Sequence, residues 1–281
     1  MKQLLKLAAI AVSLFVLQSA TAQSTTDSSE KLNPQFKLSV NYNSNLNFFG
    51  RTDSLKSSGL FPLAEFWLSS KFYINAAPVF VNNAVQQFDY AGTVATIGYQ
   101  NVTPDWITGL YLTKPFYKES SELVQSALQL QSGVNLTYRN NIVNINAGGN
   151  MMFSDKADFS TSGGLDHIIR IQNNNSVIVI DPSVYVYAGT QNFQRTYYRK
   201  NNTGFLLFPG RDQRVTEDVS RFSVLAYEAS VPVIYARGKV MLIATPSYII
   251  PQNLITVPGR PDLSERGENT FYTTLTAKYS F

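Results

Sequence analysis

The 281-residue chain contains no cysteine and only one histidine, His167. Without cysteine, the protein can form no disulfide, no thiolate metal site and no cysteine nucleophile. A single histidine also excludes a metal centre built from several imidazoles. We therefore expect no cofactor and no metal ion.

Charge is also scarce. Charged residues make up 15% of the chain, whereas a soluble domain typically carries about 25%. The formal net charge is +4, and Lys2 and Lys6 of the N-terminal segment contribute to it. So small and evenly spread a charge excludes nucleic acid as an expected partner. Aromatic residues reach 13% while the mean hydropathy is −0.09. This combination favours a transmembrane β-barrel over a soluble enzyme.

Long apolar runs are missing beyond the N-terminus, which has the pattern of a secretory signal. A basic start is followed by an apolar stretch over 7–17 and by Ala20-Thr21-Ala22, which places small residues at −3 and −1 before Gln23. The apolar stretch is well short of the roughly 20 residues that a spanning helix needs. We predict a cleaved signal peptide over 1–22, a flexible periplasmic tail over 23–35 and a barrel over 36–281.

The body of the chain alternates polar and apolar residues with a period of two. In the segment 269–281, Phe271, Leu275 and Tyr279 share one face, whereas Thr274 and Lys278 share the other. A soluble sandwich would bury the apolar face, and a membrane barrel would turn it toward lipid. The pattern predicts twelve antiparallel strands, at 36–45, 60–68, 72–82, 86–100, 105–114, 122–138, 142–153, 163–171, 177–189, 219–235, 239–251 and 269–281.

The connections between these strands favour an up-and-down barrel. Short connections such as 69–71 and 139–141 alternate with longer ones such as 46–59, 154–162 and 190–218. A barrel with periplasmic turns and extracellular loops sorts its connections in this way. An even number of strands also returns both ends of the barrel to the periplasm. Aromatic residues at strand ends fit girdles at the two membrane interfaces, with Phe66, Phe72, Tyr99, Trp106, Tyr138, Tyr235 and Tyr279 on the turn side.

The last residues carry the most specific signal. Leu275, Tyr279 and Phe281 form an alternating pattern that ends on phenylalanine. This strand resembles the last strand of Gram-negative outer-membrane β-barrel proteins, without pointing to a specific subfamily. Thr276 stands where many members of that family have glycine. The resemblance implies an outer-membrane location, contact with outer-membrane lipids and recognition of these three residues by the barrel-assembly machinery.

The polar face is assigned to the lumen, because a charge facing lipid near the midplane costs about 2–4 kcal/mol. Either a small polar solute passes along this lining, with its charges tuning selectivity, or the charges pair and merely stiffen the wall. The short turn between Arg170 and Asp181 favours pairing for those two. The predicted lining residues are Lys37, Glu65, Gln129, Gln131, Asn135, Asn144, Asn146, Asp166, Arg170, Asp181, Glu228, Thr274 and Lys278.

The longest connection, 190–218, combines cations and tyrosines with an apolar middle at 204–209. It either folds inward and constricts the pore or stands above the membrane as an extended hairpin, and the hairpin is the favoured interpretation. The candidate constriction residues are Arg195, Tyr197, Tyr198, Arg199, Arg211 and Arg214.

Two other classes of function stay open beside a porin-like channel. A non-conducting barrel would serve as an adhesin, a structural scaffold or an accessory subunit. An accessory subunit would show a lipid-facing patch of small or polar residues, for which Gly92, Thr96, Gly98 and Gly109 are the candidates, although such small residues also simply allow strong barrel curvature. An outer-membrane lipid hydrolase would need a serine beside His167, which we place on the lipid-facing side near the loop end. No serine follows two residues after His167, although Ser162 or Ser183 could approach it in space. Catalysis is not expected, and the oligomeric state is left open.

Overall fold

The computed structural model describes residues 34–52, 55–85, 87–118, 128–154, 157–199, 213–256 and 264–281, the side chains of 191–199 and 213–220 excepted. Every regular element in these ranges is a β-strand, and none of them holds a helix long and apolar enough to span a membrane. The strands are β1 (Gln35–Asn43), β2 (Asn47–Phe48), β3 (Arg51–Thr52), β4 (Ser58–Trp67), β5 (Phe72–Asn82), β6 (Asp89–Val102), β7 (Trp106–Tyr117), β8 (Leu130–Tyr138), β9 (Asn144–Phe153), β10 (Ala157–Asp166), β11 (Ile169–Asn173), β12 (Ser176–Ile180), β13 (Ser183–Arg199), β14 (Gln213–Ser230), β15 (Val233–Arg237), β16 (Val240–Pro251) and β17 (Thr270–Ser280).

The main sheet closes on itself. Strand β17 pairs with β1 on one side and with β16 on the other, and every neighbouring pair is antiparallel. The closed ring runs β1-β4-β5-β6-β7-β8-β9-β10-β13-β14-β16-β17 and returns to β1. The predicted twelve-stranded antiparallel barrel is therefore confirmed.

Three of the predicted strands are interrupted in one place each. The breaks lie at His167–Ile168 between β10 and β11, at Asp181–Pro182 between β12 and β13, and at Val231–Pro232 between β14 and β15. The register continues across the first two breaks, because Asp166 pairs with Ser183 and Ile169 pairs with Ile180. Proline has no N–H to give to the ladder.

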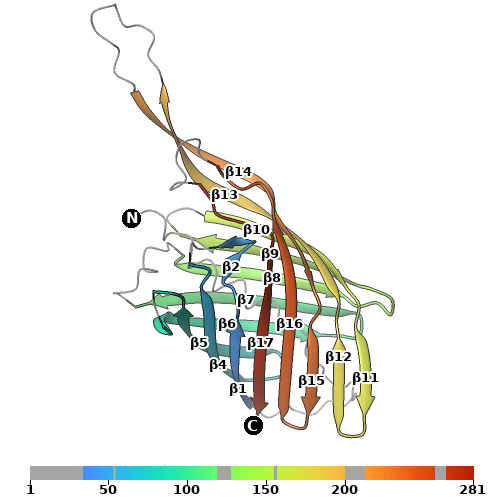
Figure 1. Ribbon diagram of the computed structural model, residues 1–281. Coiled ribbons are helices and arrows are strands. Elements are labelled where there is room, and N and C mark those ends of the chain that lie inside the picture. The colour runs from blue at the N-terminus through green and yellow to red at the C-terminus, as the bar shows by residue number, and fades with distance from the viewer. Residues whose placement is uncertain are drawn as a thin grey trace, which may run out of the picture.

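The proline carbonyls nevertheless accept hydrogen bonds across the break. Pro182 accepts from the N–H of His167 at 3.1 Å, and Pro232 accepts from the N–H of Asp181 at 3.0 Å. Beyond the break, β11, β12 and β15 continue the wall toward the end that holds the C-terminus (Figure 1).

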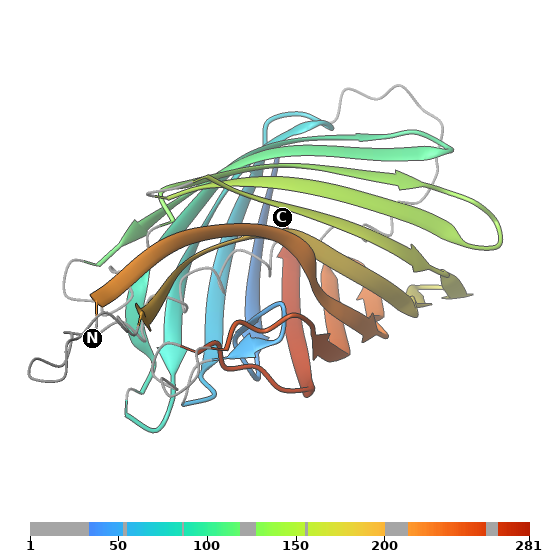
Figure 2. The same ribbon diagram turned by 90° about the horizontal axis from the view of Figure 1, so that it is seen from above.

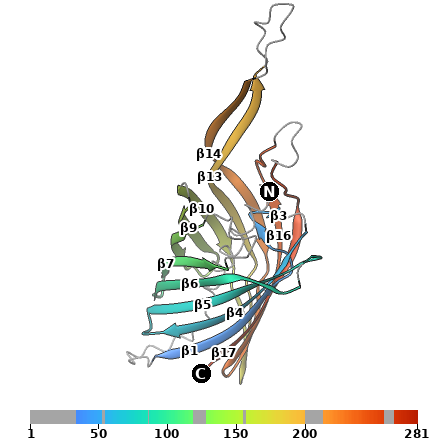
Figure 3. The same cartoon turned by 90° about the vertical axis from the view of Figure 1, so that its left-hand side faces the viewer.

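The two ends of the barrel differ as predicted. The C-terminus and the β11–β12 and β15–β16 turns lie at one end, whereas the β13–β14 hairpin projects from the other (Figures 1 and 3). One predicted loop is wrong, since 154–162 lies largely in β10, whose Ala157 pairs with Phe153 of β9. Ser160, Thr161 and Ser162 of that predicted loop instead pair with β9 on one side and with β13 on the other.

The outer face of the ring is apolar. Leu38 and Val40 of β1, Leu110 and Leu112 of β7, and Leu275 of β17 are all exposed on it. Aromatic pairs mark its turn-side border, with ring centroids 4.9 Å apart for Phe72–Tyr99 and for Trp106–Tyr138. An apolar band bordered by aromatic rings is the exterior of a barrel that crosses a membrane.

Candidate functional site: the lumen and the hairpin inside it

Polar side chains line the inner face of the seam where the first and last strands meet. Thr276 of β17 donates its hydroxyl to Oδ1 of Asn41 on β1 at 2.7 Å. Asn41 in turn donates its Nδ2 to the carbonyl of Phe61 on β4 at 3.1 Å. The predicted lining residue Thr274 lies next along the same face, where Asn43 donates to it at 3.5 Å.

Three predicted inward charges come together nearer the turn side of this seam. Nζ of Lys278 lies 2.8 Å from Oε1 of Glu65, and the same oxygen accepts the indole N–H of Trp67 at 3.3 Å. Nζ of Lys37 lies 4.6 Å from the centroid of the Trp67 ring, within the range of a cation–π contact. Glu65 thus pairs with Lys278, whereas Lys37 lies over the Trp67 ring and has no carboxylate partner among the ion pairs of the described residues.

A second polar group lies on the wall formed by β7, β8 and β9. Nε2 of Gln131 lies 3.3 Å from the hydroxyl of Tyr111 and 3.4 Å from Oδ1 of Asn150, to which Tyr111 also donates. The neighbouring Thr96 and Thr113 share a buried hydroxyl–hydroxyl bond of 2.9 Å. Of the predicted residues here, Asn135 shares the inward face, and Gln129 lies before β8 and is exposed.

A third group surrounds Asp166 at the turn-side end of β10. Asn144 donates its Nδ2 to Oδ2 of Asp166 at 2.6 Å, and Asn146 donates to the other carboxylate oxygen. Thr137 completes the chain by donating to Oδ1 of Asn146 at 2.6 Å. A carboxylate with both oxygens bonded to amides is held in a fixed orientation on the inner wall.

The predicted pairing of Arg170 with Asp181 is not among the ion pairs of the described residues. Arg170 lies opposite Val179 in the β11–β12 hairpin and is exposed. Asp181 occupies the break before β13, two positions farther along the strand. The register therefore places the two residues out of line, which the length of the turn alone could not reveal.

Three tyrosines of the inner wall each stand opposite a glycine on the neighbouring strand. The pairs are Tyr73 with Gly98, Tyr111 with Gly133, and Tyr185 with Gly164. A Cβ placed on any of these glycines would overlap the facing tyrosine ring. The rings therefore lie over their glycine partners, and the wall needs glycine at these positions.

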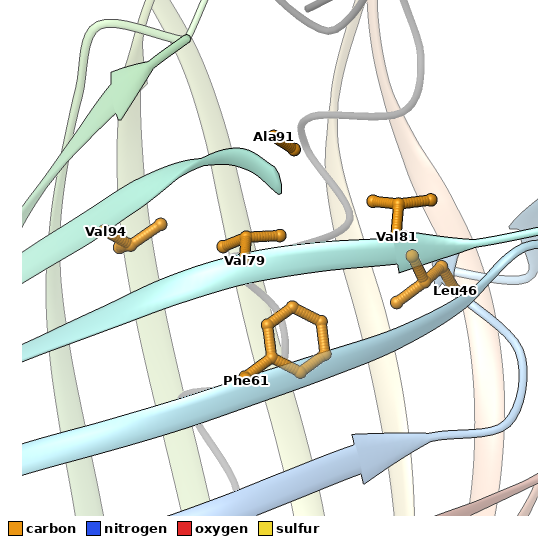
Figure 4. Packing of buried hydrophobic residues seen from close by; sticks show 6 residues of the cluster. All are labelled: Leu46, Phe61, Val79, Val81, Ala91 and Val94. Carbon is orange, nitrogen blue, oxygen red and sulfur yellow. The ribbon is translucent and has the colours of Figure 1, made fainter. Parts of the chain in front are cut away.

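The most consequential inward segment was not predicted. Residues 46–57, expected to be an extracellular loop, contain the short hairpin β2–β3, in which Leu46 is buried. Leu46 belongs to a buried cluster with Phe61 of β4, Val79 and Val81 of β5, and Val94 of β6, and it lies beside Val81 in Figure 4. Phe48 packs against the same cluster. One side of the hairpin is thus fixed to the inner wall of β4, β5 and β6.

The other side of the hairpin reaches a different part of the wall. Phe49 packs against Ala226 of β14, Ile249 of β16, Tyr272 of β17 and Tyr187 of β13, with 5.1 Å between the Phe49 and Tyr187 ring centroids. Strands β5 and β14 are separated in the ring by β4, β1, β17 and β16, so they face each other nearly across the barrel. The hairpin therefore bridges the lumen.

Arg51 joins the hairpin to three other segments, and its side chain is only 6% exposed. Its Nε lies 3.1 Å from Oε2 of Glu265, which precedes β17. Its guanidinium also donates to the carbonyls of Leu225 and Gln252, both at 3.1 Å. The β2–β3 hairpin lies beside the segment that precedes β17 (Figure 2), and Arg51 forms a β-bridge with Gly267 there.

The turn of this hairpin requires glycine. Gly50 has a φ of 74°, in the left-handed region that other residues rarely adopt. A Cβ at Gly50 would lie 2.9 Å from Cβ of Pro251, so the backbone also approaches β16 closely. The sequence did carry a signal, because Leu46, Phe48 and Phe49 are large apolar residues in a supposed solvent-exposed loop.

The side chains of the candidate constriction loop at 191–199 and 213–218 lie outside the described part of the structure, which gives their backbone alone. Residues up to Arg199 and from Gln213 continue the β13–β14 ladder, in which Arg195 pairs with Glu217 and Tyr198 with Arg214. The described strands of the hairpin project beyond the barrel (Figure 1). Arg211 and the apolar stretch 204–209 lie outside the described residues.

The proposed patch of small residues is wrong in its orientation. Thr96 faces inward with Thr113, Gly98 lies under Tyr73, and a Cβ at Gly109 would contact Asn135 of the inner wall. Gly92 lies where the register shifts between β5 and β6. The predicted alternation was one residue out of phase on these two strands, since the exposed residues are Ile97 on β6 and Leu110 on β7.

His167 lies at the turn-side end of the barrel, and its expected position near the loops is wrong. It occupies the break after β10, and its Nδ1 is 2.5 Å from the carbonyl of Ile142 in the β8–β9 turn. Ser183 shares a hydroxyl–hydroxyl bond of 2.8 Å with Ser230, and Ser162 lies on the inner face of β10. His167 therefore has a backbone carbonyl as its partner. Of the two candidate serines, Ser183 bonds to Ser230 and Ser162 lies on the inner face.

Comparison with known proteins finds similarity in structure only. No family model matches the sequence, and no curated protein matches it. An outer membrane channel from Pseudomonas putida F1 aligns with 92% of this chain and 100% of its own, at 9% identity and a TM-score of 0.47. A bacterial polysaccharide outer membrane secretin aligns with 89% and 98% of the two chains, at 9% identity and a TM-score of 0.38. LpxR from Salmonella typhimurium aligns with 86% and 99%, at 10% identity and a TM-score of 0.31.

The chain has the architecture of Gram-negative outer-membrane β-barrel proteins. That statement rests on the closed ring, its apolar exterior and its polar interior. It establishes the fold and no particular subfamily.

Proposed function

We propose that this protein is an outer-membrane channel for a small polar solute. The observation that carries the proposal is the polar inner wall, where buried oxygens remain without a protein partner among the described residues. These include Oδ1 of Asn75 and Oε1 of Gln131. A buried polar atom without a hydrogen bond costs about 1–3 kcal/mol. Water in the lumen removes this cost, and a hydrated lumen is the medium in which a polar solute travels.

The charges on this wall support a weak preference for cations. Asp166, Asp181 and Glu228 lie on the side of the ring formed by β10 to β14, whereas Lys37, Glu65 and Lys278 neutralise one another in part at the seam. Acidic groups without a basic partner lower the energy of a cation in a narrow pore. This wall supports the proposed solute class, and fold similarity is no part of that support.

The test is conductance of the refolded chain from Gln23 onward in a planar bilayer. We expect discrete steps and a reversal potential that favours cations in a salt gradient. Asp166→Asn should shift that potential toward zero, whereas Asp105→Asn in the β6–β7 turn should leave it unchanged. A folded barrel that passes neither ions nor small sugars, even after the lumen hairpin is shortened, would contradict the proposal.

A non-conducting structural barrel is the second candidate, and the hairpin across the lumen is the observation that favours it. A permanently seated hairpin would leave a stable scaffold that presents the long β13–β14 hairpin outside the membrane. The shortened-hairpin variant separates the two candidates, since only a channel gains conductance from it.

The proposal includes the route to the membrane. Residues 1–22 direct export and are removed before Gln23, and the last strand is recognised by the barrel-assembly machinery through Leu275, Tyr279 and Phe281. Both statements are supported by the sequence patterns described above. N-terminal sequencing of the protein from isolated outer membranes should give Gln23 as the first residue.

A further inference from the structure

We propose that the β2–β3 hairpin is a displaceable plug of the lumen and that Arg51 is its latch. This inference rests on the proposed channel function, because a plug regulates a pathway that must exist without it. It differs from the alternative of a constriction by the loop 190–218, of which the described parts, 190–199 and 213–218, continue the β13–β14 ladder.

The plug is held mainly by side chains and by few backbone ladder bonds. Strands β2 and β3 contain two residues each and pair only with one another. Their described backbone links to the rest of the barrel are the Arg51–Gly267 bridge and the bond from Thr52 N to the carbonyl of Arg266 at 3.1 Å. A wall strand, in contrast, shares a continuous ladder with a neighbour on each side. The hairpin can therefore leave without breaking the ring.

Arg51 is suited to the role of latch because it concentrates the attachment in one side chain. It contacts a carboxylate before β17, a carbonyl of β14 and a carbonyl after β16, while its own hairpin supplies the carbonyl of Phe49 at 3.1 Å. Glu265 is fixed in turn, since its Oε2 also accepts the N–H of Ile255 at 3.0 Å. Loss of the guanidinium would leave a buried carboxylate and several carbonyls without their donor.

The closed position also holds strained backbone. Phe49 and Lys56 have φ values of 51° and 49°, and Asn253, beside Arg51's acceptor Gln252, has a φ of 51°. Residues with side chains adopt this region at a cost that surrounding contacts must offset. Three of the four such residues in the described chain therefore lie in the plug or at its seat. Release of the plug would relax this strain, which places the closed and open positions closer in energy.

Opening would uncover a distinct surface. Phe49 covers Tyr187 and Tyr272, and Tyr272 donates its hydroxyl to Glu228 at 2.7 Å. With the hairpin displaced, two tyrosines and a carboxylate face the lumen, and a hydrated cation or a polyhydroxylated solute finds partners there. The plug thus controls access to Glu228 on the acidic side of the wall.

The first experiment measures conductance in planar bilayers for Arg51→Ala. We expect a higher open probability and larger steps than in the unchanged protein. Glu268→Gln is the matched control, because Glu268 and Lys56 join the same two segments by an ion pair whose side chains are 57% and 63% exposed. That variant should conduct like the parent. If Arg51→Ala does not fold, Glu265→Gln removes the same ion pair with less change of volume.

A disulfide lock tests the motion directly. The chain has no cysteine of its own, and Thr52 and Arg266 lie directly opposite one another beside the Arg51–Gly267 bridge. Cα atoms in such a pair are about 5.5 Å apart, a separation that a disulfide spans. Oxidised Thr52→Cys/Arg266→Cys should hold conductance at its lowest level, and reduction should restore openings. Openings that persist unchanged in the oxidised form would overturn the proposal.

A chemical readout separates the plug from the channel. Ala226 has an exposed fraction of 0% beneath Phe49, so Ala226→Cys reports on the seat of the plug. A membrane-impermeant maleimide should modify this thiol on the order of tenfold faster in the Arg51→Ala background, because the opened state is more populated. Equal rates in both backgrounds would reject the plug. Faster modification in the Arg51→Ala background without any conductance would support the displaceable plug and contradict the channel function.

Discussion

Lys278 of β17 reaches across β1 to Glu65 of β4, with 2.8 Å between Nζ and Oε1. The two residues share no ladder, since β1 lies between their strands and pairs with both. Their ion pair therefore braces the seam at which the first and last strands close the ring. Closure is the step that leaves a barrel without free edges.

Glu65→Gln should destabilise the barrel by about 1–3 kcal/mol, because the ammonium of Lys278 loses its charged partner inside the wall. Urea unfolding in lipid vesicles, followed by tryptophan fluorescence, measures the difference. Lys56→Ala, which breaks an exposed pair, should change the unfolding free energy by less than about 0.5 kcal/mol. A similar decrease in unfolding free energy in both variants would show that burial of the Glu65–Lys278 pair contributes nothing to stability.

Gly98→Ala should destabilise the wall by about 1–3 kcal/mol, because a methyl group there overlaps the ring of Tyr73. Gly163→Ala is the control on the outer face, where a Cβ meets no atom within 4 Å. That change should be neutral or slightly stabilising, since alanine restricts the unfolded chain. Equal unfolding midpoints for the two variants would contradict the close Tyr–Gly packing.

Val134→Arg and Asn135→Arg test the assignment of faces on β8 at adjacent positions. Val134 is 44% exposed on the outer face, where arginine should cost about 2–4 kcal/mol near the membrane midplane. Asn135 faces the lumen, so arginine there should cost less and should instead shift ion selectivity toward anions. A larger loss of stability for Asn135→Arg than for Val134→Arg would contradict the assignment of Val134 to the lipid and Asn135 to the lumen.

Phe281→Ala should reduce assembly in cells more than it reduces stability. The Phe281 ring lies 5.5 Å from that of Phe36 and 4.9 Å from that of Tyr279, so part of its role is packing at the seam. We expect a several-fold drop in folded protein in the outer membrane, detected by heat-modifiable migration. Spontaneous refolding into vesicles lacks the assembly machinery and should proceed to nearly the parental yield. A matching defect in both assays would assign the residue to packing alone.

The strand pattern was predictable because it depends on local chemistry. Residues such as Leu275 and Lys278 must face lipid and lumen respectively, and a strand offers only two faces, so alternation in the sequence fixes the number of strands and their approximate limits. Short turns and the acidic or amide lining around Asp166 and Asn144 follow from the same alternation.

The contents of the lumen were decided by tertiary structure. Leu46, Phe48 and Phe49 form no periodic pattern, and their burial depends on walls that are brought together only when β17 meets β1. The latch from Arg51 to Glu265 joins residues 214 positions apart. Gly98 lies under Tyr73 on the inner wall and His167 lies beside the β8–β9 turn, places that counting along the strands did not give. Alternation is a property of each strand alone, whereas the inside of a barrel exists only after the ring has closed.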